Sequence, residues 1–240
     1  MKYKMNIKVR YSECGGDSKV PLHQILNYFQ DAATFQSEEL GYGVSYNMDQ
    51  HRGWFLLAYD INISRKPEMF ENLTIETDPY KMKGYYGYRR FWIVDAAGDA
   101  IVTGDSIWIF MDTDSLLPVK VPEDMSRAYV EGTSNDKVVI KRKIRPGKEW
   151  DRADEFDISQ VYLDTNQHVN NNYYALWAEN LLDEEQTERF RIDYRKAAIL
   201  GDHVIIDRQE LDSSTVFRFE NQNQDLLAYV SIVKKSLKKG

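Results

Sequence analysis

Residues 63–77, ISRKPEMFENLTIET, align without a gap with residues 193–207, DYRKAAILGDHVIID. The alignment places the turn Glu71-Asn72 over the turn Gly201-Asp202. In both segments the residues after the turn are rich in β-branched side chains, which favour strands. Self-similarity of this kind predicts that the chain of 240 residues contains two copies of one structural unit.

Each copy begins with a helix-like segment, residues 21–40 in the first and residues 169–182 in the second, and strand-like segments follow it. The apolar stripes are Leu22, Ile25, Leu26, Phe29 and Ala33 in the first copy and Val169, Tyr173, Leu176, Trp177 and Leu181 in the second. A sheet with one apolar face needs a cover, and one long helix can provide it. We therefore expect an α+β fold with two antiparallel sheets, each wrapped around a long central helix.

Residues 126–150, between the two copies, are rich in glycine, proline and charged residues, which is typical of a linker. We therefore expect an N-terminal domain over residues 1–130, a linker over 131–150 and a C-terminal domain over 151–240. A helix laid across a curled antiparallel sheet, duplicated in one chain, resembles the tandem double-hotdog arrangement.

The composition excludes several classes of protein. A net charge of −7 argues against a nucleic-acid partner, because such binding needs many cations against phosphates. The single cysteine, Cys14, cannot form an internal disulfide, which fits a reducing compartment. The first residues lack the apolar core of a signal peptide, and no run approaches the roughly 18 apolar residues of a membrane span. We expect a soluble cytoplasmic protein with no membrane span.

No cofactor site is visible in the sequence. The four histidines show no zinc-like pairing, and no glycine-rich phosphate loop follows a strand. We therefore expect neither a metal nor a cofactor.

Residues 161–177, VYLDTNQHVNNNYYALW, carry the chemistry-bearing residues Asp164, Asn166 and His168 immediately before the second helical stripe. A spacing of two puts these three side chains on one side of an extended segment. The backbone N–H groups of Val169 and Asn170, at the start of the helix, are candidates for binding an oxyanion. The alternative is that Asp164 and Asn166 are helix caps and His168 is structural.

The same segment resembles the signature D-x-N-x-H-V-N-N-x-x-Y of plant-type and bacterial acyl-acyl carrier protein thioesterases. Every fixed position is met, by Asp164, Asn166, His168, Val169, Asn170, Asn171 and Tyr174, and Trp177 falls where the family has a tryptophan. The resemblance extends over nearly the whole chain. It implies a hydrolase that acts on fatty acyl-acyl carrier protein in lipid metabolism.

One departure from the family pattern bears on the mechanism. Family members commonly carry Glu-Cys after a Tyr-Arg-Arg strand, and this chain has Ala197-Ala198 there. Because Cys14 lies in an unrelated place, a Cys-His mechanism is excluded. Asp193 matches an acidic residue of the family, in a role that is either catalytic or structural.

The three residues fit a hydrolytic mechanism. His168 is expected to act as general base on a water molecule, because imidazole titrates near neutral pH. Asp164 would orient the water or the imidazole, and Asn166 would hold the thioester or the water. Direct attack by Asp164, which gives an anhydride, is the competing version, and the sequence leaves both open.

The first copy lacks these three residues, so we expect it to shape the acyl pocket while the second copy catalyses. The pocket candidates are Phe29, Ala33, Trp54 and Leu56. Ordinary core packing demands the same residue types and remains the alternative.

The expected partner is acyl carrier protein, whose acidic surface calls for basic residues on this chain. The docking candidates are Arg65, Lys66, Arg89, Arg90, Arg195 and Lys196, with ordinary surface salt bridges as the alternative. An acyl-CoA thioesterase, a non-catalytic acyl-binding hotdog and a hotdog dehydratase are the rival functions. The oligomeric state stays open, with a homodimer as one outcome.

Overall fold

The described residues of the computed structural model form ten strands in the hydrogen-bonded order β1-β3-β4-β5-β2-β7-β10-β9-β8-β6. Every pairing whose register is described is antiparallel. The expectation of two sheets is therefore wrong, because β2 (Arg52–Ile63) has a strand neighbour along each of its edges. A shared strand removes an exposed edge that two separate sheets would have had.

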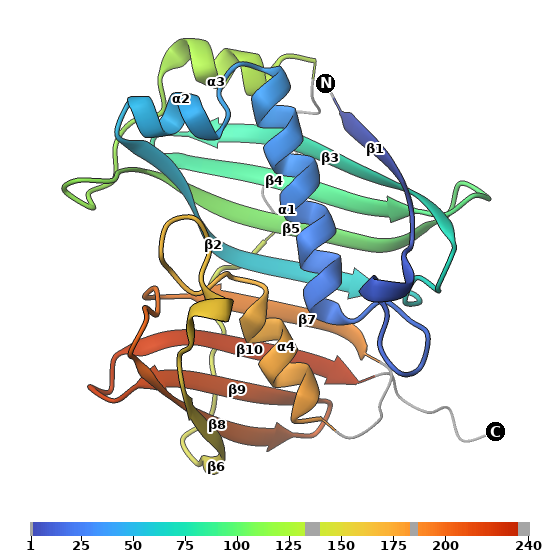
Figure 1. Cartoon of the computed structure of the whole chain (residues 1–240), viewed down its shortest axis with the longest axis vertical. Coiled ribbons are helices and arrows are strands. Elements are labelled where there is room, and N and C mark those ends of the chain that lie inside the picture. Colours follow the sequence, from blue (N-terminus) through green and yellow to red (C-terminus); the bar gives the residue numbers. More distant parts are fainter. Residues whose placement is uncertain (1, 133–139, 183–186, 235–240) are drawn as a thin grey trace. The chain divides into compact units, whose positions relative to one another are not determined.

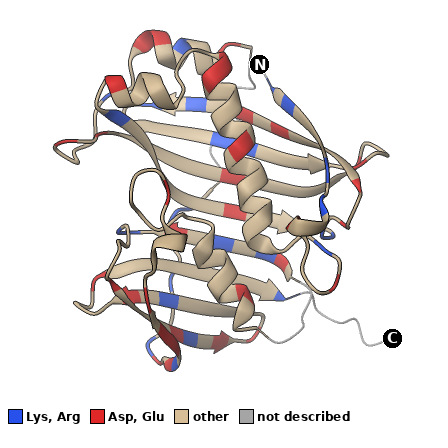
Figure 2. Cartoon of the chain, in the orientation of Figure 1, with Lys and Arg blue, Asp and Glu red and all other residues tan. Residues whose placement is uncertain are grey.

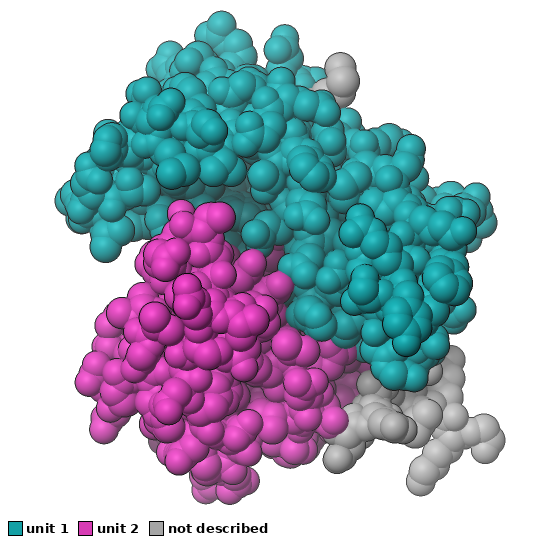
Figure 3. Space-filling view, viewed as in Figure 1, with its two compact units in different colours: residues 1–57, 64–140 teal, residues 58–63, 141–240 magenta. Residues whose placement is uncertain are grey.

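The structure describes residues 2–132, 140–182 and 187–234. Unit 1 comprises residues 1–57 and 64–140, and unit 2 comprises residues 58–63 and 141–240 (Figure 3). Residues 58–63, which belong to β2, thus cluster with unit 2 rather than with the N-terminal domain. Part of the expected linker, residues 133–139, lies outside the described residues.

In unit 1 the helix α1 (Leu22–Glu39) lies across the strands (Figure 1). Its apolar stripe is buried, with Leu22, Ile25 and Phe29 fully inaccessible, so the helix expected at residues 21–40 is confirmed. The Phe29 ring stacks on Phe91 of the sheet with 4.5 Å between ring centroids. The other elements of unit 1 are β1 (Tyr3–Lys8), the 3-10 helix η1 (Tyr11–Glu13), α2 (Val44–Asp49), β3 (Asn72–Lys83), β4 (Tyr86–Val94), β5 (Ala100–Asp112) and α3 (Glu123–Val130).

In unit 2 the helix α4 (Tyr173–Asn180) packs on strands of the sheet (Figure 1). Tyr174 and Trp177 of this helix contact the ring of Phe219, at centroid distances of 5.3 and 6.2 Å. The other elements are β6 (Asp151–Asp157), the 3-10 helix η2 (Gln160–Tyr162), β7 (Thr187–Tyr194), β8 (His203–Leu211), β9 (Ser214–Asn221) and β10 (Leu226–Lys234).

The expectation of a long central helix in the second copy is wrong. The helix α4 has eight residues and begins at Tyr173, not at residue 169. Val169 instead pairs in extended geometry with Leu163, and the turn that follows contains Asn171 and Asn172. Asparagine is a poor helix former and favours turns, so the periodic apolar residues overstate the length of this helix.

The structural repeat is one residue out of register with the gap-free sequence alignment. Asn72 opens the β1–β3 pairing opposite Lys8, and His203 opens the β6–β8 pairing opposite Asp157. Asn72 thus corresponds to His203, whereas the alignment placed it over Asp202. The structural register superimposes the buried residue Leu73 on the buried residue Val204, whereas the alignment places Leu73 over the partly exposed His203.

Candidate functional site

Residues 163–169 form a closed loop that carries Asp164, Asn166 and His168. The Asp164 N–H donates to the His168 carbonyl oxygen at 2.7 Å, and the Gln167 N–H donates to the Asp164 carbonyl oxygen at 3.1 Å. Gln167 has a φ of 59°, in the left-handed region that reverses the chain. The loop is therefore held by its own backbone before any side chain is considered.

The Asp164 carboxylate organises this loop. Its Oδ1 accepts hydrogen bonds from the Asn166 N–H at 2.8 Å and from the His168 N–H at 3.2 Å. Its Oδ2 lies 3.5 Å from Nδ2 of Asn166, which is exposed. The structure thus brings Asp164 and Asn166 together and fixes the backbone of His168 beside them.

The imidazole of His168 is half-buried. Within the described residues it makes no hydrogen bond and no ion pair, and the Asp164 carboxylate is engaged by backbone N–H groups. A base whose ring nitrogens have no protein partner can still bind a water molecule or a substrate.

The prediction that Val169 and Asn170 offer free N–H groups is wrong. The Val169 N–H donates to the Ala198 carbonyl oxygen, and the Asn170 N–H donates to that of Tyr162, each at 2.9 Å. Both residues also precede α4 rather than open it. Neither group can bind an oxyanion without giving up its present partner.

Two buried tyrosines, Tyr174 and Tyr194, hold backbone segments near His168. The sequence analysis did not select either of them as a site residue. The Tyr194 hydroxyl donates to the Asn171 carbonyl oxygen at 2.8 Å. The Tyr174 hydroxyl is hydrogen-bonded to the backbone of Ala198. Burial raises the pKa of both phenols, so both hydroxyls stay protonated at neutral pH. Of these two tyrosines, the sequence could have pointed only to Tyr174, because it is a fixed position of the thioesterase signature.

Ala198 links the Tyr174 hydroxyl to the backbone around His168. Its carbonyl oxygen accepts the Val169 N–H, and its neighbour Ile199 pairs with His168 as an isolated bridge. Ala198 itself is fully inaccessible. The alanine at this position therefore serves as backbone support for the site loop.

Asp193 has structural partners. Its side chain is fully buried and is bound by Arg195 at 2.5 Å, by Arg142 at 3.5 Å and by the Ile144 N–H at 3.4 Å. Burial raises the pKa of this carboxyl, and the two guanidinium groups oppose that effect. Asp193 thereby holds residues 142–144, and among the described residues it makes no hydrogen bond or ion pair with His168.

Three of the acyl-pocket candidates lie in the apolar interior of unit 1, and Trp54 is partly buried. Phe29, Ala33 and Leu56 are at most 8% exposed. Trp54 contacts the rings of Phe110 and Tyr129, at centroid distances of 4.9 and 6.3 Å. These positions fit a pocket wall and a core equally well, so the pocket stays a prediction.

Most of the basic docking candidates are engaged within the chain. Arg89 is buried and donates to Gln36 at 2.5 Å and to Thr77 at 3.0 Å, so its selection as a docking residue is wrong. The remaining pairs are Arg65 with Glu71 and Asp95, Arg90 with Asp105, Arg195 with Asp193, and Lys196 with Asp225. Lysine and arginine are interspersed with acidic residues in each unit (Figure 2).

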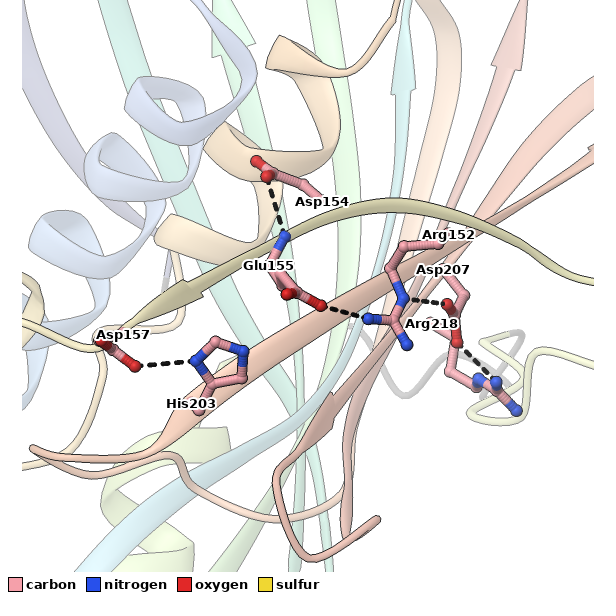
Figure 4. Close-up of polar contacts among 7 residues, drawn as sticks. All are labelled: Arg152, Asp154, Glu155, Asp157, His203, Asp207 and Arg218. Carbon is pink, nitrogen blue, oxygen red and sulfur yellow. Dashed lines mark hydrogen bonds and ion pairs between the residues drawn. The ribbon is translucent and has the colours of Figure 1, made fainter.

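Two other histidines of the described chain face carboxylates. His203 Nδ1 lies 2.8 Å from Asp157, and His51 Nδ1 lies 3.1 Å from Asp114. Further along β8, Asp207 is bound by both Arg152 and Arg218 (Figure 4). No group of three or more potential metal ligands occurs in the part of the chain that the structure describes.

Both halves of the chain match models of one family. The model of the acyl-ACP thioesterase N-terminal domain matches residues 1–129, and that of the C-terminal domain matches residues 147–233. The chain therefore belongs to the acyl-ACP thioesterase family.

Curated relatives agree with this assignment at low identity. The palmitoyl-acyl carrier protein thioesterase of Arabidopsis thaliana is 22% identical over 215 residues, which cover 81% of this chain and 52% of the relative. The oleoyl-acyl carrier protein thioesterase of Coriandrum sativum is 26% identical over 247 residues, which cover 90% and 64%. The chain thus spans about half to two thirds of the length of these relatives, and the names of both describe them as chloroplastic.

Solved structures share the fold. An acyl-ACP thioesterase from Bacteroides thetaiotaomicron superimposes with a TM-score of 0.88 at 14% identity and covers 98% of both chains. The 12:0-ACP thioesterase from Umbellularia californica gives a TM-score of 0.81 at 16% identity over 98% of this chain and 97% of its own. At these identities the likeness concerns the fold alone. No helix among the described residues has the length and apolarity of a membrane span.

Proposed function

We propose that this chain hydrolyses the thioester of a fatty acyl-acyl carrier protein and releases a free fatty acid and the carrier. The observation that carries the proposal is the loop in which one carboxylate, Asp164, holds the backbone of both Asn166 and His168. Membership of the acyl-ACP thioesterase family supports the substrate class.

In the proposed reaction His168 removes a proton from water, and the resulting hydroxide attacks the thioester carbonyl. The leaving thiolate needs no protonation, since thiols ionise near pH 8.5. What water alone does not supply is a positioned nucleophile and a stabilised oxyanion. The imidazole of His168 is half-buried and has no hydrogen-bond partner among the described residues, which supports a role in positioning and activating the water nucleophile.

We assign the oxyanion to the side-chain amide of Asn166 rather than to the backbone N–H groups of Val169 and Asn170. The N–H groups of Val169 and Asn170 are already bonded, whereas the Asn166 amide is exposed and lies at the limit of hydrogen-bond distance from Asp164. An amide donor can serve as an oxyanion ligand, and the loss of one such donor typically costs two to three orders of magnitude in kcat.

Water activation is favoured over direct attack by Asp164. Attack through Oδ1 would give up the hydrogen bonds from Asn166 and His168 that hold the loop. Hydrogen bonds to a carboxylate stabilise its charge and so weaken it as a nucleophile. In this version Asp164 positions the other two residues and orients the water.

The test is a hydrolysis panel over carrier-bound acyl chains of graded length, with acyl-CoA substrates in parallel. His168→Ala and Asp164→Asn are each expected to lower kcat by about two to four orders of magnitude, because each removes a step in water activation. His203→Ala is the matched control, since His203 belongs to the same unit and is paired with Asp157. Near-normal turnover in both site variants would remove the assignment.

Multiple-turnover hydrolysis in ¹⁸O-water separates the two versions of the attack. Water activation leaves the Asp164 carboxylate unlabelled after many cycles, whereas an anhydride that water opens at the Asp164 carbonyl carbon would carry solvent oxygen into that side chain. Mass spectrometry of the peptide that contains Asp164 gives the readout.

The acyl chain is proposed to lie against the apolar interior of unit 1, near Trp54 and Leu56. Tight packing around these residues supports a wall of fixed shape, which is what selection by chain length requires. If Leu56 lines the acyl pocket, Leu56→Ala should change the preference for acyl chain length and retain the rate on the best substrate.

A further inference from the structure

One basic hollow in unit 1 is assigned to no role so far. It has a volume of about 270 Å³ and lies between the β3–β4 turn, the segment before α3 and α3 itself. Three cationic side chains from these three parts of the chain line it, and Glu123 is the one acidic residue among its lining. The lining residues are Met82, Lys83, Gly84, Lys120, Val121, Glu123, Ser126 and Arg127.

The cations of this hollow differ from the other basic residues of the chain. Lys83 and Arg127 are exposed and make no ion pair within the described residues. Lys120 lies 3.9 Å from Glu123, but both side chains are highly exposed, at 78% and 86%, and such a pair contributes little. In contrast, a partner that bound Arg65 or Arg90 would have to break existing ion pairs.

The walls of the hollow are fixed by backbone hydrogen bonds. The Val121 N–H donates to the Gly84 carbonyl oxygen at 3.0 Å, which ties the segment before α3 to the β3–β4 turn. Gly84 has a φ of 64°, which favours glycine at this turn. The three cations are therefore presented by a backbone that needs no ordering when a partner binds.

The floor of the hollow is apolar and continuous with the core. Val121 is 4% exposed and belongs to a buried cluster with Phe110, Met125 and Tyr129, against which Met82 also packs. An apolar floor with a cationic rim is complementary to a helix that presents an apolar side chain between acidic residues.

We propose that this hollow docks the acidic carrier protein, with Lys83, Lys120 and Arg127 contacting its carboxylates. The inference rests on the proposed function for the identity of the partner. It also explains how a chain with a net charge of −7 can bind an acidic protein, since a local cluster of cations offsets the repulsion between the two molecules.

Charge reversal tests the docking surface. Lys83→Glu and Arg127→Glu are each expected to raise KM for acyl-carrier substrate about 3- to 10-fold with kcat unchanged, because they remove an attraction and add a repulsion outside the reacting centre. Raised salt should weaken binding by the wild-type chain and have less effect on these variants.

Lys8→Glu is the matched control. It makes the same change of charge at an exposed lysine of unit 1 that does not line the hollow. Hydrolysis of an acyl-N-acetylcysteamine thioester, which has no carrier, should be equal in all three variants and the wild type. Equal KM values for the carrier substrate in Arg127→Glu and Lys8→Glu would overturn the proposal.

A binding measurement keeps the docking surface separate from the reaction. Calorimetry with a carrier whose acyl group is attached through an amide, which resists hydrolysis, reports docking alone. If the chain hydrolysed no thioester but Arg127→Glu still weakened this binding, the proposed function would fail and the docking surface would stand. Unchanged binding in Lys83→Glu and Arg127→Glu would refute the surface whatever the enzyme does.

Discussion

Tyr174 and Tyr194 hold the two backbone segments that meet at His168. Tyr194 fixes the carbonyl of Asn171, beyond the loop, and Tyr174 fixes Ala198, which in turn pairs with Val169. Among the described residues, neither phenol makes a hydrogen bond to Asp164, to Asn166 or to the His168 ring. In the proposed reaction they are therefore positioning residues, which act through the backbone.

Removal of one hydroxyl should expose this role. Tyr194→Phe is expected to lower kcat about 3- to 10-fold with little change in KM, because a displacement well below 1 Å near a reacting group is costly. The loss of one buried hydrogen bond should also lower the free energy of unfolding by about 1 kcal/mol. Steady-state kinetics and urea unfolding measure the two effects.

Tyr129→Phe provides the control for this prediction. The Tyr129 hydroxyl is also buried and hydrogen-bonded, to Ser37 Oγ at 2.8 Å, but it lies in unit 1. It should show the same loss of stability with full kcat. If the two variants lost kcat equally, the assignment of Tyr194 as a positioning residue would be wrong.

For single residues, the sequence predicts which polar residues belong to the candidate site, but it does not predict their hydrogen-bond partners. The spacing of Asp164, Asn166 and His168 indicated that they belong together, because alternate residues of an extended segment share a side. The occupation of the Val169 N–H depends on Ala198, which is distant in sequence and whose approach no local pattern reveals. The burial of Arg89 likewise depends on the cover that α1 gives to the sheet.

Among the elements, the turn before β3 and the turn before β8 are built alike. In the first, Glu71 Oε2 accepts the Glu68 N–H at 2.9 Å; in the second, Asp202 Oδ2 accepts the Ile199 N–H at 3.0 Å. Since Ile199 pairs with His168, the second turn also supports the site loop. An acidic side chain at the end of each turn thus fixes the register of the strand that follows.

The acidic turn residue of unit 1 makes stability depend on pH. The pKa of Glu71 is lowered from its usual 4.5, mainly by hydrogen bonds from Arg65 and then by the Glu68 N–H, while burial opposes the shift. A folded-state pKa below the unfolded value means that the stabilisation is present above about pH 4.5 and is lost as pH falls through the folded-state pKa. Glu71→Gln should lower the free energy of unfolding by about 1 kcal/mol at pH 7, and by less at pH 4.

Urea unfolding at the two pH values checks this dependence. Glu68→Gln, at the exposed start of the same turn, should change stability little at either pH. A gap between wild type and Glu71→Gln that stayed constant from pH 7 to pH 4 would contradict the linkage.

The lengths of α1 and α4 show where the spacing of apolar residues predicts the extent of a helix correctly and where it does not. α1 follows its apolar stripe closely, because a continuous helix of 18 residues covers the sheet of unit 1. The stripe that ends in α4 begins with residues that are not helical, since Val169 is drawn into extended pairing with Leu163. Tertiary pairing overrides local pattern most easily where the local residues, such as Asn171 and Asn172, are weak helix formers.

Over the whole molecule the duplication extends to individual hydrogen bonds. The Gly15 N–H donates to the Lys19 carbonyl oxygen at 2.8 Å, as Asp164 does to His168, and the Val20 N–H donates to Pro67 as Val169 does to Ala198. Ser18 has a φ of 62°, close to that of Gln167. The loop of unit 1 therefore has the backbone of the site loop without its three side chains.

A graft of the three residues into unit 1 tests whether the backbone of this loop is sufficient for hydrolysis once it carries Asp, Asn and His. Gly15→Asp, Asp17→Asn and Lys19→His, made together in a His168→Ala chain, should leave the free energy of unfolding within about 1 kcal/mol, because the loop conformation already exists. The graft should not restore hydrolysis, since the proposed reaction presents the thioester to residues 163–169 of unit 2 and not to the loop of unit 1. Stopped assays against the His168→Ala parent give the comparison, and recovered turnover would contradict this placement of the substrate.

The loop of unit 1 also contains the one thiol of the chain, Cys14, which is partly exposed. A maleimide dye would therefore attach at a single position, inside a segment whose backbone hydrogen bonds and φ angles resemble those of residues 163–169. Burial and the neighbouring Glu13 raise the pKa of this thiol, so labelling calls for mildly alkaline buffer. Fluorescence from that dye would follow the unfolding of unit 1 while turnover is counted independently on the same sample.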